Sequence, residues 1–107
     1  MRIYIASPYR VPSIVDRVNN VYKSLDAANE LLKLGHVPLP PLLAHMWHQY
    51  TPKPDEEWIR IGKAWLREQD CVLRLPGQSV GADAEVEYAR GRGMSVYYSL
   101  KDIPKRP

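Results

Sequence analysis

Hydrophobic and polar positions along the chain follow two different periods. Four short apolar runs, rich in β-branched and aromatic residues, predict buried strands at 2–6, 36–40, 70–75 and 94–100. Between them, apolar residues recur three and four positions apart, which predicts amphipathic helices at 14–34, 55–69 and 79–92. Strands and helices therefore alternate along the whole chain.

The ends of the predicted helices carry recognisable signals. Ser13 and Ser79 stand where an N-cap is expected, and Gly35 follows the first helix as a C′ residue. Asp55 is placed to cap the middle helix, with acids in its first turn. The proline-rich segment 41–54 is less regular, and we expect a short helical turn and a mobile loop there.

Alternation of strands and helices predicts one α/β domain, residues 1–107, with a small parallel sheet of four to five strands between two helical layers. Ligands of such sheets bind beyond the carboxyl ends of the strands. Three loops are expected at that edge. They are Ser7–Pro12, the segment from Pro40 onward, and Pro76–Gly81.

Three carboxylates alternate in the last helix, at Asp83, Glu85 and Glu87. Each residue advances about 100° around a helix axis, so Asp83 and Glu87 share a polar face and Glu85 lies across from it, beside small residues. A buried carboxylate is unfavourable unless it is paired. Glu85 either forms an ion pair with Arg92 or reaches the sheet rim, or it serves as a nucleophile or general base in a pocket.

Other polar residues of the same edge admit two interpretations each. Ser79 and Gly81 at a helix N-terminus offer backbone N–H groups to an anion, or form a plain cap. Arg10 faces the same cleft or is a solvated surface residue. His45 and His48 lack a third metal ligand at a usual spacing, so no metal is expected. Asp70 opens the third strand as a buried acid or as part of a helix end.

Composition narrows the class of partner. Fifteen basic and twelve acidic residues give a net charge of +3 without a basic run, so we expect no nucleic-acid polymer as ligand, whereas a small anion is compatible. The single cysteine, Cys71, lies in an apolar run and is expected to be a buried structural thiol. There is neither a signal-like segment nor an apolar stretch of about 20 residues, so we expect a cytoplasmic protein without membrane contact.

Three stretches together resemble the nucleoside 2-deoxyribosyltransferase superfamily, which includes nucleoside 5'-monophosphate N-glycosidases. They are IYIASPYR, GHVPLPPLLAH and DCVLRLPGQSVGADAEVEYARGRGMSVY. The sharpest motif is S-x-G-x-x-x-E with an alanine four residues later, formed by Ser79, Gly81, Glu85 and Ala89. The resemblance implies a flavodoxin-like, Rossmann-like three-layer sandwich.

The resemblance also implies roles for individual residues. Glu85 would attack the anomeric carbon of the sugar, as the carboxylate of a retaining glycosidase does, and Tyr4 would hold it. Asp70 would act at the base or sugar. Arg10 and Ser79 would bind a 5'-phosphate.

The combined interpretation is an N-glycosidase for a nucleoside or its 5'-monophosphate. Ser7, Gly81 and His45 join the substrate-binding candidates. No cofactor is expected. The alternatives are a deoxyribosyltransferase and a nucleotide-binding or sensor module without catalysis. Trp58 and Trp65, which share one helical stripe, indicate a homodimer or larger homo-oligomer.

Overall fold

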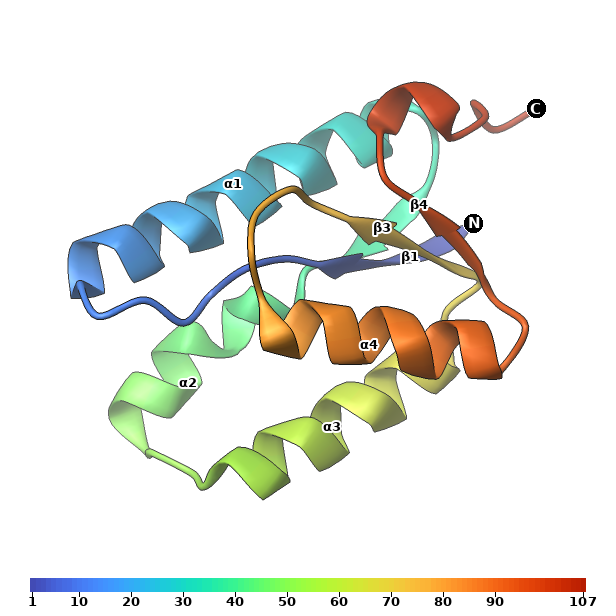
Figure 1. Cartoon of the computed structure of the whole chain (residues 1–107). Coiled ribbons are helices and arrows are strands. Elements are labelled where there is room, and N and C mark those ends of the chain that lie inside the picture. Colours follow the sequence, from blue (N-terminus) through green and yellow to red (C-terminus); the bar gives the residue numbers. More distant parts are fainter.

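Figure 1 shows the computed structural model, which describes residues 1–107, as a parallel sheet between helical layers. The four strands are β1 (Arg2–Ala6), β2 (Val37–Leu39), β3 (Cys71–Arg74) and β4 (Ser95–Tyr97). The four α-helices are α1 (Ile14–Lys33), α2 (Ala44–Tyr50), α3 (Asp55–Arg67) and α4 (Val80–Gly91). Two 3₁₀ helices, η1 (Pro41–Leu43) and η2 (Leu100–Asp102), complete the structure.

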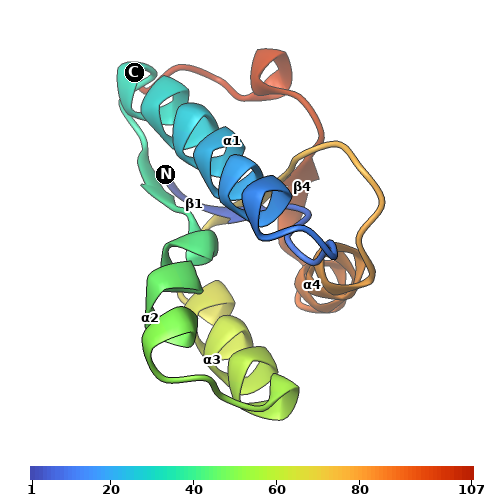
Figure 2. The same ribbon diagram turned by 90° about the vertical axis from the view of Figure 1, so that its left-hand side faces the viewer.

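The strands lie in the order β2-β1-β3-β4 and all pairs are parallel. Tyr4 of β1 is opposite Val72 of β3, and Ala6 is opposite Arg74. Helix α1 covers one face of the sheet, and α3 and α4 cover the other, as the two views in Figures 1 and 2 show. The predicted α/β sandwich with a small parallel sheet of four to five strands is confirmed, and the sheet has four.

Each face of the sheet has its own core because successive residues of a strand point to opposite sides. On the α1 side, alternate residues Ile3, Ile5, Cys71 and Leu73 pack under Ala27, Ala28 and Leu31. On the other side, Tyr4, Ala6 and Val72 pack under Leu66, Ala82 and Ala89. Cys71 is buried, as expected, and burial raises the pKa of its thiol to about 11.

The helix ends follow most of the capping signals. The hydroxyls of Ser13 and Ser79 accept hydrogen bonds from Asp16 N and Ala82 N, at 3.3 and 3.0 Å. Gly35 has a φ of 87°, the left-handed geometry of a C′ glycine. The expected cap at Asp55 is wrong: Pro54 occupies the N-cap position and Asp55 is the first helical residue.

The segment 41–54 contains more helix than its sequence indicated. The 3₁₀ helix η1 leads directly into α2, and only residues 51–54 separate α2 from α3. The two helices contact each other through Trp47 and Trp58, whose rings meet edge to face at 5.3 Å between centroids. No helix of the protein has both the length and the apolar character that a membrane span requires.

Candidate active site

The three carboxylates of α4 differ in their exposure to solvent. Asp83 and Glu87 are exposed, as the helical phase predicted, and Glu85 is half-buried at the margin of the packed face. The centre of that face is formed by Ala82, Val86 and Ala89. Gly81, one of the small residues expected beside Glu85 on the inward side, is exposed. The centre of the face is therefore rotated by about 80°, most of one residue step, from the predicted one.

Glu85 accepts a hydrogen bond through Oε2 from the hydroxyl of Tyr4, a fully buried side chain of β1. The expected alternative, an ion pair with Arg92, does not form, because that guanidinium lies over the ring of Tyr88. Ser7 Oγ is the one fully buried side-chain oxygen or nitrogen without a partner. Glu85 Oε1, which makes no hydrogen bond, must therefore reach solvent.

Burial changes the acidity of both members of this pair. Desolvation raises the pKa of Glu85 to about 7, although the Tyr4 hydrogen bond and the charge of Arg74 each lower it. The pKa of Tyr4 is raised by its burial and by the neighbouring carboxylate, so its hydroxyl remains a proton donor. The pair thus provides an oriented carboxylate that gains and loses its proton near neutral pH.

Helix α3 approaches the pair at Gly62, a residue that the sequence did not single out. A methyl group built on Gly62 would lie 3.5 Å from Tyr4 Oη and 3.8 Å from Glu85 Oε2. Glycine is unfavourable inside a helix by about 1 kcal/mol relative to alanine. A glycine within the apolar stripe of a predicted helix was the signal available in the sequence.

The loops that follow β1 and β3 lie against each other at the carboxyl ends of these strands. Leu75 N donates to Ala6 O at 2.9 Å, and a methyl group built on Gly77 would lie 3.0 Å from Pro8 Cγ. Ser7, the first residue after β1, is buried with its hydroxyl unpartnered. The predicted meeting of loops at the carboxyl ends of the strands is present for these two.

Arg10 is engaged with an acid rather than left free. Its guanidinium forms a two-point contact with the carboxylate of Asp55, with Nη1 2.9 Å from Oδ2. The hydrogen bond from Arg10 is the main cause that lowers the pKa of Asp55. Both side chains are largely exposed. Any anionic ligand of Arg10 therefore has to compete with Asp55.

Residue His45 lies on α2 and contacts the loop after β1. Tyr9 Oη is hydrogen-bonded to His45 Nδ1, and the two rings meet edge to face. The second histidine of the segment, His48, accepts a 2.7 Å hydrogen bond from the indole of Trp58. Both histidines thus connect α2 to its neighbours, and no cluster of three or more metal-ligating side chains occurs.

Asp70 is not brought together with Glu85. It immediately precedes β3 and is exposed at the amino ends of the strands. Its carboxylate accepts a 2.6 Å hydrogen bond from Arg2 N, which lowers its pKa, and lies 3.6 Å from the Arg2 guanidinium. The structure thus places Asp70 in the pairing of β1 with β3 and shows no contact between it and Tyr4 or Glu85, and its expected contact with base or sugar stays a prediction.

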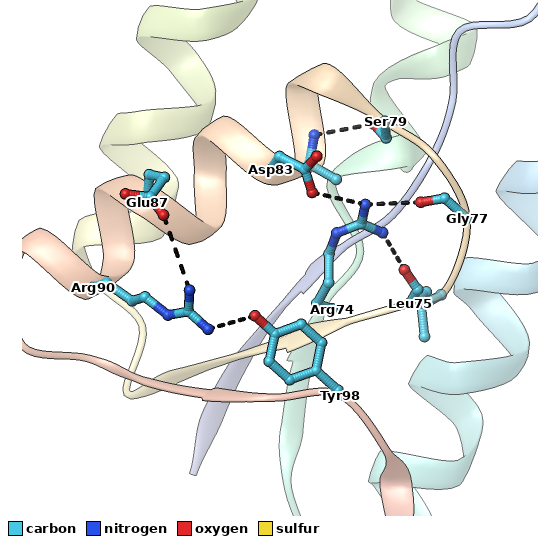
Figure 3. Close-up of polar contacts among 9 residues, drawn as sticks. Arg74, Leu75, Gly77, Ser79, Asp83, Glu87, Arg90 and Tyr98 are labelled. Carbon is cyan, nitrogen blue, oxygen red and sulfur yellow. Dashed lines mark hydrogen bonds and ion pairs between the residues drawn. The ribbon is translucent and has the colours of Figure 1, made fainter.

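A further buried charge, Arg74, was missed by the sequence analysis. It ends β3 with its guanidinium under the first turn of α4, where it pairs with Asp83 (Figure 3). Asp83 and Glu87 were expected to share a polar face; both are exposed, but Glu87 lies 3.9 Å from Arg90, whereas Asp83 pairs with the buried Arg74. An arginine in a buried strand was the signal in the sequence.

No protein-family model and no curated protein sequence matches the chain. Among solved structures, it is similar to a 2-deoxyribosyltransferase from the psychrotolerant bacterium Bacillus psychrosaccharolyticus, with a TM-score of 0.62 and 19% sequence identity. The match covers 90% of this chain and 69% of that chain. The fold of this protein is thus that of the nucleoside 2-deoxyribosyltransferases, as the motif resemblance implied.

Proposed function

We propose that this protein cleaves the N-glycosidic bond of a (deoxy)nucleoside or its 5'-monophosphate, with Glu85 as the nucleophile. The observation that carries the proposal is the contact between Glu85 Oε2 and the buried Tyr4, which leaves Oε1 without a hydrogen-bond partner. Its support is the desolvation of that carboxylate near the carboxyl ends of a parallel sheet, where ligands of such folds bind. The likeness of the fold to a 2-deoxyribosyltransferase agrees with this chemistry.

The reaction would proceed in two steps, as in retaining glycosidases. Glu85 Oε1 attacks the anomeric carbon while the bond to the base nitrogen breaks, and the bonding electron pair leaves with the base, which takes a proton from water. The sugar is then held as an ester of Glu85. Water attacks the same carbon, loses a proton, and releases the free sugar and the carboxylate.

The surroundings of Glu85 fit the demands of the first step. A pKa of about 7 leaves roughly half of the molecules with an ionised nucleophile at neutral pH, and such a carboxylate is more basic than an ordinary one. The hydroxyl of Tyr4 fixes Oε2, so the attacking oxygen is presented in a defined direction. We expect base release to rise with pH around the Glu85 midpoint.

Substrate binding is assigned to the groups around the loops after β1 and β3. The first backbone N–H groups of α4, at Val80 and Gly81, are donors suited to a 5'-phosphate. The buried, unpartnered hydroxyl of Ser7 would join them once the loop after β1 opens to the ligand. Ser79 supports them as the cap of α4. Arg10 would join on release from Asp55, and His45 would contact the base or sugar.

The test is base release from a panel of nucleosides and nucleotides, followed by chromatography. We expect release from at least one substrate, and a loss on the order of 10⁴-fold or more in Glu85→Gln. The matched control is Glu87→Gln, which alters an exposed carboxylate of the same helix and should retain activity. Release that is undiminished in Glu85→Gln would contradict the assigned nucleophile, and no release by the folded wild type would contradict hydrolysis.

Transfer to a second base is the other candidate reaction, favoured by the similarity to a 2-deoxyribosyltransferase. In that case the ester of Glu85 is attacked by a base nitrogen in place of water. Adding an excess of a second free base distinguishes the two, because transfer yields a new nucleoside and hydrolysis yields free sugar. A binding module without catalysis would give neither product, yet its ligand would still raise the unfolding temperature.

A further inference from the structure

Arg74 is a charged residue of β3 whose side chain faces the interior of the protein. Cys71 and Leu73 point to the α1 side of the sheet, whereas Val72 points to the side of α3 and α4. Arg74 follows in the same alternation and lies on the side of Val72 and Tyr4. Only 8% of it is exposed. A guanidinium so placed is unfavourable unless every part of it is paired.

All of its partners lie in one short stretch of chain, between the end of β3 and the first turn of α4. Nη1 donates to Leu75 O, and Nη2 donates to Gly77 O at 2.8 Å and to Asp83 Oδ1 at 3.0 Å (Figure 3). One rigid planar group therefore fixes the loop and the start of the helix together. Gly77, with a φ of 116°, provides the sharp turn that brings its carbonyl within reach.

The helix that Arg74 anchors is the one that carries Glu85. Asp83 precedes Glu85 by two residues, and the Arg74–Asp83 contact is made from the sheet side of α4. Tyr4 holds Glu85 from β1, directly opposite the residue of β3 that lies two before Arg74. Two polar side chains of adjacent strands thus support α4, one by binding Glu85 and one by binding the turn before it.

We propose that Arg74 is a positioning residue for Glu85, which fixes the Leu75–Ser79 loop and the first turn of α4 and supplies positive charge on the buried side of that helix. The role rests on the proposed function, in which Glu85 is the nucleophile. The charge of Arg74 lowers the pKa of Glu85 against the effect of desolvation. Two other residues lie next to the Glu85 carboxylate, Tyr4 of β1 and the uncharged Gly62 of α3. The ammonium group of Lys63, also on α3, lies over the ring of Tyr88.

The test separates the charge of Arg74 from its hydrogen bonds. Arg74→Gln removes the positive charge but keeps an N–H donor group. Arg74→Lys keeps the charge but loses the two planar guanidinium nitrogens that bind Leu75, Gly77 and Asp83. The measured quantity is the titration midpoint of the Glu85 carboxyl by NMR, in protein shown to be folded by thermal unfolding. We expect Arg74→Gln to raise the midpoint by about one unit, a tenfold change in proton affinity, and Arg74→Lys to leave it near the wild-type value.

An exposed arginine of the same helix is the control. Arg90 contacts Glu87 and Tyr98 on the solvent side, so Arg90→Gln should not move the Glu85 midpoint. A midpoint that stays at the wild-type value in folded Arg74→Gln overturns the proposal. If that variant does not fold, Arg74→Lys decides through the lost hydrogen bonds: the backbone amides of the Leu75–Ser79 loop and of the first turn of α4 should exchange with solvent faster than in the wild type, and unchanged exchange overturns the proposal.

The titration needs no substrate, so its outcome is independent of the proposed reaction. In the variants that retain base release, the pH at half-maximal rate should move with the NMR midpoint, a coupling that a merely structural role would not produce. If the wild type releases no base while Arg74→Gln still raises the Glu85 midpoint, hydrolysis fails and the action of Arg74 on Glu85 stands. If base is released but the midpoint does not move, only the role of Arg74 fails.

Discussion

The two faces of the sheet are built from the same four strands, yet they differ in chemistry. On the α1 side Ile3, Ile5, Leu31 and Leu73 form a buried apolar cluster, and the one polar side chain that α1 buries, Ser24, donates a 2.7 Å hydrogen bond to Val21 O of its own helix. On the other side α3 and α4 contribute a similar set, Leu66, Ala82 and Ala89, but a tyrosine, a carboxylate and a guanidinium share the space. The α1 face stabilises the sheet by apolar packing. The opposite face also buries polar and charged groups that apolar packing does not require.

If this division holds, a large cavity on the apolar face should leave the site unaffected. Leu31 is fully buried, so Leu31→Ala should lower the free energy of unfolding by about 3 kcal/mol, while the neighbouring and exposed Leu32→Ala should change it little. Urea denaturation measures both. The Glu85 midpoint should be unchanged in each, and a shift after Leu31→Ala would mean that the two faces are not independent.

On the site face, the ionisation of Glu85 should oppose folding. Its pKa rises from 4.5 in the unfolded chain to about 7 in the folded protein, so the folded state binds the proton more tightly. Stability from this group is fully present below pH 4.5 and is lost as the pH rises through 7. That loss amounts to about 3 kcal/mol.

Glu85→Gln removes this dependence. The free energy of unfolding of the variant, relative to that of the wild type, should therefore increase by about 3 kcal/mol as the pH rises from below 4.5 to above 7. Denaturation over a pH series measures this difference. Glu87→Gln on the exposed face serves as the comparison. A stability difference between Glu85→Gln and the wild type that stays constant with pH would show that the carboxylate is not desolvated.

Tyr4→Phe keeps the ring and removes the hydroxyl that holds Glu85. A hydrogen bond to a charged group is worth about 1.5–3 kcal/mol, so base release near neutral pH should fall about 10- to 100-fold, and the Glu85 pKa should rise because a lowering contact is lost. Kinetics across a pH series measures both effects. The control Tyr22→Phe, on the exposed side of α1, should change neither the rate of base release nor the Glu85 pKa. Equal rates in Tyr4→Phe and the wild type would remove Tyr4 from the mechanism.

The smallest expected effect is at Gly62. A methyl group fits there at ordinary contact distances, so Gly62→Ala should stabilise α3 by up to about 1 kcal/mol and raise the Glu85 pKa slightly by excluding water. Gly91→Ala adds a methyl group to α4 where nothing lies within 4 Å and should affect stability alone. Thermal unfolding and the NMR titration together distinguish the two glycines, and a Glu85 midpoint that moves equally in both would contradict the contact at Gly62.

Local patterns were sufficient to predict the architecture and the orientation of Glu85. Strand and helix periods predicted the α/β sandwich, and helical phase separated Glu85 from Asp83 and Glu87 because each depends on residues close in sequence. The motif resemblance added the Tyr4 contact, which joins residues 81 positions apart and which no local pattern contains.

The remaining features depend on which charged groups meet in three dimensions. Arg10 was expected to be available for phosphate, but the start of α3 brings Asp55 within reach of it. Asp70 was expected at the site, yet the register of β1 and β3 places it beside Arg2. Arg74 was not recognised because the loop that satisfies its donors has no sequence signature beyond Gly77.

The central claim is that α4 presents Glu85 as a desolvated carboxylate against Tyr4, and the titration of the side-chain carboxyls of the wild-type protein by NMR tests it most directly. The Glu85 resonance is identified by its absence from the Glu85→Gln spectrum. The structure predicts a midpoint of about 7 for that resonance. A midpoint near 4.5, the value of an unperturbed glutamate, would contradict the claim and with it the proposed nucleophile.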